Sequence, residues 1–168
     1  MFNYEEAFSR NIGWVTREEQ QKLRNTTVAI GGLGGVGGDH TIVLSRLGIG
    51  NFHISDLDDY DVANFNRQAG ANMHTLGKAK AAVMEETIKG INPEASVKNF
   101  DKGIDEDNLE AFLEGVDIYV DSLDIFCLEI RRKVFRRCYE KGIPTITAAP
   151  MGMGTAFVVF MPGKMSFD

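Results

Sequence analysis

A glycine-rich segment near the start of the chain constrains the fold more than any other feature. The letters GLGGVG have the spacing G-x-G-x-x-G and lie between a β-branched run and a helical pattern. In that context Gly32 permits a tight turn, Gly34 lets the backbone approach a phosphate, and Gly37 lets the helix pack closely on the strand. With Gly35, the helix start presents free N–H groups to an anion. The segment predicts a phosphate-binding turn; the alternative is a packing turn only.

Short apolar runs alternate with longer helical patterns along the chain, which is typical of a parallel α/β sheet. Strands are predicted at residues 27–30, 52–55, 95–100, 117–120, 144–148 and 155–160, and helices at 16–23, 37–47, 76–91, 105–113 and 128–140. Thr16 and Glu19 have the spacing of a capping box at the first helix. We therefore predict a Rossmann-like, mainly parallel sheet with helices on both faces.

Length and composition narrow the class of protein. The chain has 168 residues, which suits one domain, 1–168, and its abrupt end after a predicted strand suggests that the natural protein continues. With 24 acidic and 18 basic residues, its net charge of -6 gives no long-range attraction to nucleic acid. No apolar run approaches the roughly 20 residues of a membrane span, and residues 1–10 are acidic and polar, so we expect no signal peptide. We expect a cytoplasmic protein without a membrane partner.

Acidic residues follow the second predicted strand. Asp56 stands close to where a Rossmann fold places its ribose-binding carboxylate. Asp58 belongs to the same turn, whereas Asp59 and Asp61 are expected to be solvated. These residues leave NAD and ATP equally possible.

Basic residues after this turn favour a triphosphate. The segment NFNRQ contains Arg67, and Lys78 and Lys80 lie at the start of the next predicted helix. Cations offset the negative charge of the β- and γ-phosphates and of the departing pyrophosphate. A nicotinamide site has little need for such cations. The P-loop pattern G-x-x-x-x-G-K-[ST] is absent from the sequence. This pattern favours attack at the α-phosphate over transfer of the γ-phosphate.

Two carboxylates follow the predicted strand at 117–120. Asp121 and Asp124 come where ligands bind in open α/β sheets. Mg²⁺ takes one or two carboxylates together with phosphate oxygens, so this segment predicts a magnesium site. The alternative for Asp124 is a helix N-cap, and both roles are compatible.

These segments together resemble the ThiF-type adenylyltransferases. The resemblance covers about residues 9–160 and includes GGLGGVGG at 31–38, DLD at 56–58, NFNRQ at 64–68, GKAK at 77–80, INP at 91–93 and DSLD at 121–124. The family contains the activating enzymes of molybdopterin and thiamine synthesis, ubiquitin-activating enzymes and a tRNA threonylcarbamoyladenosine dehydratase. It implies that Asp56 binds the ribose of ATP, Arg67 and Lys80 its phosphates and Asp124 Mg²⁺, with Asn64 beside the reacting phosphate.

The resemblance also implies a homodimer, because Arg10 is similar to an amino-terminal arginine that reaches into the partner's site. Some family features are missing. Ile125 stands where the family often has Asn, and the paired C-x-x-C zinc motifs are absent from the chain. Cys127 has the apolar neighbours Phe126 and Leu128 and no indicated base, and both Cys127 and Cys138 are interpreted as packing residues.

Three functions remain open. The first is ATP-dependent adenylylation of the C-terminal carboxylate of a small ubiquitin-like or sulfur-carrier protein, with release of pyrophosphate. The second is ATP activation of a carboxylate on a modified tRNA; RLGIG at 46–50 and the glycine turn resemble that branch, but the acidic balance does not support it. The third is a non-catalytic nucleotide- or NAD-binding module. We predict the first.

Overall fold

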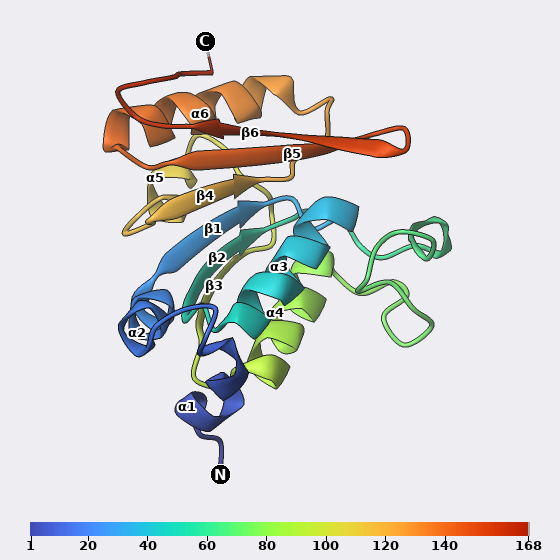
Figure 1. Ribbon diagram of the computed structural model, residues 1–168. Helices are drawn as coiled ribbons and strands as arrows, with labels where there is room; N and C mark the ends of the chain where they lie inside the picture. The colour runs from blue at the N-terminus through green and yellow to red at the C-terminus, as the bar shows by residue number, and fades with distance from the viewer. Residues whose placement is uncertain (168) are drawn as a thin grey trace.

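A computed structural model describes residues 1–167 as a six-stranded sheet with the order β3-β2-β1-β4-β5-β6. Asp168, the last residue of the predicted domain, lies outside the described residues. The strands are β1 (Thr27–Gly31), β2 (Asn51–Ser55), β3 (Ser96–Phe100), β4 (Ile118–Asp121), β5 (Thr145–Met151) and β6 (Gly154–Phe160). Strands β1 to β5 are parallel and β6 is antiparallel to β5. The predicted fold class is confirmed (Figure 1).

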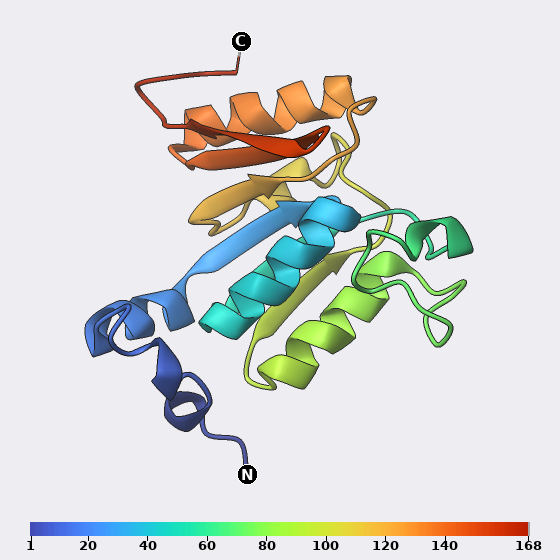
Figure 2. The same ribbon diagram turned by 45° about the vertical axis from the view of Figure 1, so that its right-hand side comes forward.

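Helices cover both faces of the sheet. Helices α3 (Gly35–Leu47) and α4 (Lys80–Ile91) lie on one face, and α5 (Leu109–Phe112) and α6 (Leu128–Lys141) lie on the other (Figures 1 and 2). Successive β1 residues point to opposite faces: Val28 and Ile30 join the core under α3 and α4, whereas Ala29 joins the core under α5 and α6. Because both faces are covered, β1 contains a continuous apolar run from Val28 to Ile30.

The amino-terminal segment packs against the end of α3. It consists of α1 (Tyr4–Ala7), a 3₁₀ turn at Ser9–Asn11 and α2 (Arg17–Asn25), which begins with the predicted Thr16–Glu19 capping box. The Tyr4 hydroxyl donates to the carbonyl of Gly48, and Gln20 donates to that of Leu47. These bonds attach the segment to the end of the helix that follows the glycine turn.

Two helices are shorter than predicted, and local hydrogen bonds explain both differences. The predicted helix 76–91 begins only at Lys80, because the backbone before it pairs with the acidic turn: the Lys80 N–H donates to the Asp58 carbonyl and the Tyr60 N–H to the Lys78 carbonyl. The predicted helix 105–113 is reduced to α5. There the Asp105 side chain accepts the N–H of Asn108 and holds a turn that competes with the helix.

The end of β5 and the start of β6 form a two-stranded ribbon. Strand β4 pairs with β5 only as far as Thr147, so Ala148–Met151 pair with β6 alone. The ribbon extends beyond the rest of the sheet (Figure 1). Among residues 1–167, no helix combines the length and the apolar character needed to cross a membrane.

Candidate active site

A hollow of about 510 Å³ lies at the carboxyl ends of β1, β2 and β4 and is called the strand-end hollow. After β1 the chain crosses to β2 on one side, while β4 lies on the other side of β1. Ligands bind where the strand order reverses in this way. The predicted site residues on its wall are Gly32, Gly34, Gly35, Asp56, Asp58, Asn64, Arg67, Lys80 and Asp124.

The glycines of the turn serve different purposes. Gly32 has φ 86°, which favours glycine, and a Cβ on Gly37 would lie 1.8 Å from the carbonyl oxygen of Gly32. Gly37 therefore contributes close packing, and it is not among the residues that line the strand-end hollow. A Cβ on Gly34 would contact only the Gln68 amide, at 3.7 Å, so the space beside Gly34 belongs to the hollow. Helix α3 starts here without a side-chain cap, so first-turn N–H groups can meet an anion.

Asp56 connects the glycine turn to the end of β2. One of its carboxylate oxygens accepts the Leu33 N–H at 2.6 Å and the other accepts the Asp58 N–H at 2.9 Å. Each carboxylate oxygen has two acceptor positions, so Asp56 retains capacity for a hydroxyl group in the hollow. The residue thus has a structural role in addition to the predicted one.

Two cations stand on the polar side of the hollow. Lys80 is the first residue of α4 and is buried, and its Nζ lies 3.0 Å from Asp58 Oδ2. The Arg67 guanidinium donates to the Ala63 carbonyl at 2.9 Å and to the Asn66 side-chain oxygen at 3.1 Å. Both acceptors are neutral, so the positive charge of Arg67 is positioned without being cancelled.

The short 3₁₀ turn Val62–Asn64 holds the segment that contains Arg67. Asp61 and Asn64 form a capping box, in which the Asn64 oxygen accepts the Asp61 N–H at 3.0 Å. Asn64 therefore lies on the wall of the hollow with one end of its amide committed to the turn.

The two predicted magnesium ligands occupy different environments, which corrects the expectation that both face a triphosphate. Asp121 is buried, and one of its oxygens accepts from Arg131 Nε at 2.9 Å and from the Thr147 hydroxyl at 2.7 Å. Asp124 is exposed and lines the hollow, and its Oδ1 accepts the Phe126 N–H. Residues 1–167 contain no group of three or more His, Cys, Asp or Glu suited to a metal. Of the two predicted ligands only Asp124 reaches the strand-end hollow, and one carboxylate fits Mg²⁺ only if phosphates and water complete its coordination.

Two polar residues on the wall were not singled out as ligands from the sequence. Gln68 Oε1 and Ser122 Oγ are buried and have no hydrogen-bond partner among the described residues. Buried polar atoms are rarely left unpaired, so both atoms point to a ligand. Their positions, at the end of NFNRQ and inside DSLD, are the only signal that the sequence carries.

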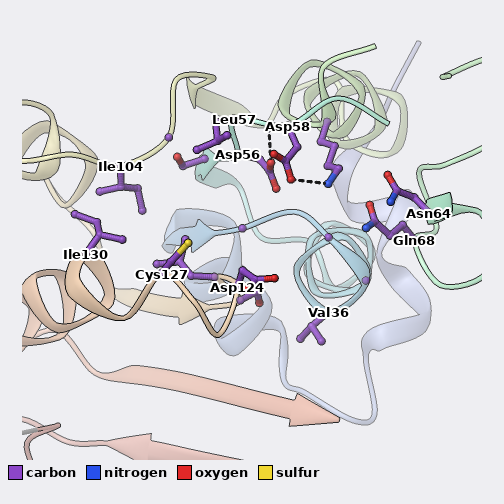
Figure 3. Close-up of a pocket in the computed structure, with 18 of the residues that line it drawn as sticks. Val36, Asp56, Leu57, Asp58, Asn64, Gln68, Ile104, Asp124, Cys127 and Ile130 are labelled. Atoms are coloured by element: carbon purple, nitrogen blue, oxygen red, sulfur yellow. Dashed lines mark hydrogen bonds and ion pairs between the residues drawn. The ribbon is translucent and has the colours of Figure 1, made fainter. Parts of the chain in front are cut away.

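The strand-end hollow has an apolar end and a polar end. Ile104 and Ile130 lie at the end opposite Asn64 and Gln68, with Asp56 between the two ends (Figure 3). An apolar slot, a carboxylate and then amides and cations follow the order of a base, a sugar and phosphates.

Arg10 and the cysteines are placed differently. Arg10 is exposed in the turn between α1 and α2, which lie beside the opposite ends of the strands from the hollow (Figure 2). Cys138 is buried, and burial raises the pKa of its thiol to about 12, which agrees with a packing role. Cys127 is exposed and lines the strand-end hollow, so its interpretation as a packing residue is wrong.

The chain is similar to enzymes of known function. The model of the ThiF family matches residues 8–167. The tRNA threonylcarbamoyladenosine dehydratase of Bacillus subtilis is 36% identical over 142 residues, 84% of this chain and 55% of the relative. The molybdopterin-synthase adenylyltransferase of Haemophilus influenzae is 31% identical over 146 residues, 84% of this chain and 57% of the relative.

A solved structure of the E. coli tRNA N6-threonylcarbamoyladenosine dehydratase in complex with ATP resembles this fold with a TM-score of 0.79 and 27% identity, covering 89% of this chain and 67% of that one. The chain spans just over half the length of the two curated relatives, 55% and 57%.

Proposed function

The chain belongs to the ThiF family, and we propose that it uses ATP to adenylylate a carboxylate, with release of pyrophosphate. The observation that carries the proposal is the order of groups along the strand-end hollow, from Ile104 and Ile130 through Asp56 to Arg67 and Lys80. This order matches adenine, ribose and phosphates. Solved relatives in complex with ATP support the choice of nucleotide.

Each residue then has a role set by its chemistry. Asp56 accepts hydrogen bonds from the ribose hydroxyls, and the N–H groups at the start of α3 receive phosphate oxygens. Arg67 and Lys80 bind the β- and γ-phosphates, and Gln68 and Ser122 find in the nucleotide the partners that the chain does not provide. Asp124 would hold Mg²⁺, which offsets phosphate charge when bound.

The reaction is a displacement at the α-phosphorus. A carboxylate oxygen of the acceptor forms a bond to phosphorus as the bond to the bridging oxygen breaks, and pyrophosphate leaves with the electron pair. Arg67 and Lys80 stabilise the negative charge that grows on the leaving group. No proton transfer is required, so positioning and electrostatics account for the catalysis.

The acceptor is the finer part of the proposal. Dehydratase relatives at 36% and 34% identity exceed the adenylyltransferase relative at 31%, which favours a threonylcarbamoyl group on tRNA over a carrier protein. This reverses the preference drawn from the acidic charge balance. AMP attached to that carboxylate is a good leaving group, so ATP could drive the loss of water. The C-terminus of a ubiquitin-like or sulfur-carrier protein is the second candidate.

Calorimetry and isotope exchange test these proposals. We expect ATP with Mg²⁺ to bind more tightly than NAD, and acceptor-dependent exchange of pyrophosphate into ATP with either tRNA that carries threonylcarbamoyladenosine or a carrier protein. Tighter binding of NAD, with no exchange for any acceptor, would contradict the adenylylation proposal. Exchange with a carrier protein alone would restore the first prediction.

We further propose that residues 1–168 form one domain, that the active form is a homodimer and that it works in the cytoplasm, where ATP is supplied. The position of Arg10 supports the dimer. Arg10 lies beside the strand ends opposite the strand-end hollow (Figure 2), so we propose that it acts in the hollow of a partner chain and not in its own. Light scattering that gives a monomer at high concentration would count against it.

A further inference from the structure

The loop that connects β4 to α6, residues 122–127, is attached to the glycine turn at its first residue. The Ser122 N–H donates to the Gly31 carbonyl at 2.8 Å. A Cβ on Gly32 would lie 2.3 Å from the Ser122 carbonyl oxygen, so the two backbone segments are in close contact. The start of the loop therefore has a fixed position beside the strand-end hollow, on whose wall Asp124 lies.

Arg131, near the start of α6, attaches the same loop at a second point. Its Nε donates to Asp121 Oδ2 at 2.9 Å, and its Nη2 donates to the Leu123 carbonyl. A guanidinium is planar and its donors have fixed directions, so this one group connects the end of β4 to the middle of the loop. The Arg131 side chain is 13% exposed and is not among the residues that line the strand-end hollow. Arg131 can therefore influence a ligand in the hollow only through the loop.

The ion pair between Arg131 and Asp121 is not explained by stability alone. The Asp121 side chain is fully buried, and its Oδ2 also accepts from the Thr147 hydroxyl. A buried ion pair often contributes no more stability than apolar residues of similar size, although removal of one partner is costly. The bond from Arg131 to Leu123 supplies another reason for the pair, because the buried carboxylate keeps the guanidinium beside the loop.

Asp124 depends on this attachment for its place in the hollow. Its Oδ1 accepts the Phe126 N–H at 3.0 Å and its carbonyl accepts the Cys127 N–H at 3.0 Å. Both bonds lie within the loop, so they shape it without joining it to the sheet. The Leu123 carbonyl belongs to the planar peptide group that leads into Asp124. Arg131 therefore fixes the orientation of the peptide from which Asp124 projects.

We propose that Arg131 is a positioning residue, which holds the Asp124 carboxylate, through the Leu123 carbonyl, where this carboxylate can bind the metal ion of a metal–nucleotide complex. The proposal rests on the proposed function and adds to it a residue that touches neither nucleotide nor metal. Loss of a group that orients a metal ligand typically weakens metal affinity by about ten- to a hundredfold. Loss of the bond to Leu123 should therefore weaken the metal-dependent part of nucleotide binding and leave the metal-free part unchanged.

Arg131→Lys is the main variant for testing this role. Lysine keeps a positive charge for Asp121, but a single ammonium does not reproduce the fork of donors that reaches two acceptors. Arg137→Lys is the matched control. Arg137 lies on the same helix, donates to Glu110 through two nitrogens and does not line the strand-end hollow.

Two further variants separate positioning from stability, and thermal melting verifies that each variant folds. Thr147→Val removes one bond to Asp121 and leaves the bond from Arg131 to Leu123 in place, so it should lower the melting temperature without weakening metal-dependent binding. Asp121→Asn/Arg131→Met removes both charges together, so no buried charge stays unpaired. This protein also lacks the bond to Leu123 and should show the same metal-dependent loss as Arg131→Lys, which keeps the test available if the lysine variant does not fold.

The probe is α,β-methylene-ATP, titrated by calorimetry with Mg²⁺ and again with EDTA. For Arg131→Lys we expect the Kd with Mg²⁺ to rise about tenfold and the Kd with EDTA to stay unchanged. Arg137→Lys and Thr147→Val should match the wild type under both conditions. Asp124→Asn should also lose metal-dependent affinity. Arg131→Lys/Asp124→Asn should lose no more than Asp124→Asn alone, because losses that act through one contact do not add.

Three results would overturn the role of Arg131: an equal rise of the Kd with Mg²⁺ and with EDTA, an unchanged Kd with Mg²⁺, or additive losses in Arg131→Lys/Asp124→Asn. A wild type whose affinity for the probe does not depend on Mg²⁺ would overturn it as well. Failure of the proposed function appears elsewhere, as tighter binding of NAD than of ATP and no pyrophosphate exchange with any acceptor. The two failures are therefore distinguishable.

Discussion

Lys80 and Asp58 form an ion pair at 3.0 Å in which the lysine side chain is 7% exposed and the aspartate side chain 59%. The ammonium is therefore held in the wall of the strand-end hollow, while its carboxylate partner remains largely in water. Solvent screens the carboxylate more than the lysine. A triphosphate that enters the hollow can take over the lysine without leaving a buried carboxylate unpaired.

This asymmetry predicts the effect of removing each lysine of GKAK. Lys80→Met should reduce adenylylation on the order of a hundredfold, the loss expected for one preorganised electrostatic group. Lys78→Met is the matched control, because Lys78 is exposed and does not line the strand-end hollow. Pyrophosphate exchange measures the difference, and equal losses in the two variants would remove Lys80 from its proposed role.

The glycine turn allows binding and folding to be separated. Gly34→Ala adds a methyl group beside an ordinary contact at 3.7 Å, so the melting temperature should stay near that of the wild type while ATP binding weakens. Gly37→Ala places Cβ 1.8 Å from a backbone oxygen and should destabilise the protein by about 3 kcal/mol or more. Thermal melting and calorimetry on both variants check this. Tight ATP binding by a stable Gly34→Ala protein would argue against a phosphate beside Gly34.

The two aspartates of DSLD should respond differently to the loss of one charge. Asp124→Asn keeps an oxygen for the Phe126 N–H, so stability should be retained while adenylylation falls on the order of a hundredfold. Asp121→Asn leaves Arg131 without its carboxylate and should cost about 3 kcal/mol or more of stability. Denaturant unfolding and pyrophosphate exchange distinguish them. Full activity of Asp124→Asn would remove this residue from the mechanism.

His53 predicts a loss of stability between neutral and mildly acidic pH. Burial lowers the pKa of His53 from its ordinary 6.5, although its ring nitrogen lies 2.7 Å from the Phe112 carbonyl, a contact that opposes the shift. The unfolded chain therefore binds more protons as the pH falls through 6.5, and the free energy of unfolding decreases. His40 acts in the same direction, because burial also lowers its pKa.

The slope of melting temperature against pH from 7 to 5 should become shallower in His53→Gln and stay unchanged in the exposed control His74→Gln. Acidic residues lower the stability at a more acidic pH. Hydrogen bonds from Arg137 and Lys141 lower the pKa of Glu110 to about 2, so this residue reduces the free energy of unfolding only below its ordinary pKa of 4.5. A slope in His53→Gln equal to that of the wild type would contradict the assignment.

The proposed dimer predicts complementation between two defective chains. Arg10→Ala and Lys80→Met should each be nearly inactive, because either the partner's arginine or the lysine is missing from every site. Mixing them under conditions that exchange subunits should restore activity, since one site of each mixed dimer has both residues. Mixing each variant with itself is the control. If mixing restores no activity although light scattering shows mixed dimers, Arg10 does not act across the interface.

Sequence patterns were sufficient to predict the fold and many of the residues that line the strand-end hollow, because these patterns depend on residues that are close together in the chain. The continuous apolar run of β1, the Thr16 capping box and the glycine spacing each depend on near neighbours in the chain. The separate roles of Asp121 and Asp124 depend on a distant partner. Nothing in DSLD indicates that Arg131 and Thr147 enclose the first aspartate.

The same reason explains what the sequence did not reveal. Gln68 and Ser122 are recognisable as ligand candidates only when their surroundings show that they lack partners. In the folded chain α3 and the β5–β6 ribbon line one pocket, although His40 and Ala149 are far apart in the sequence. A helix start at Lys80 instead of residue 76 follows from pairing with the acidic turn.

The ribbon beyond Thr147 has a kinetic consequence. Two strands without a third are marginally stable in water, so the amides of Ala148, Ala149 and Met151 should exchange with deuterium through local opening, before those of β1 and β2. The ribbon could then move while the glycine turn stays rigid. Substitutions in the ribbon would accumulate without harm to nucleotide binding, because no residue of the ribbon beyond Thr147 lines the strand-end hollow.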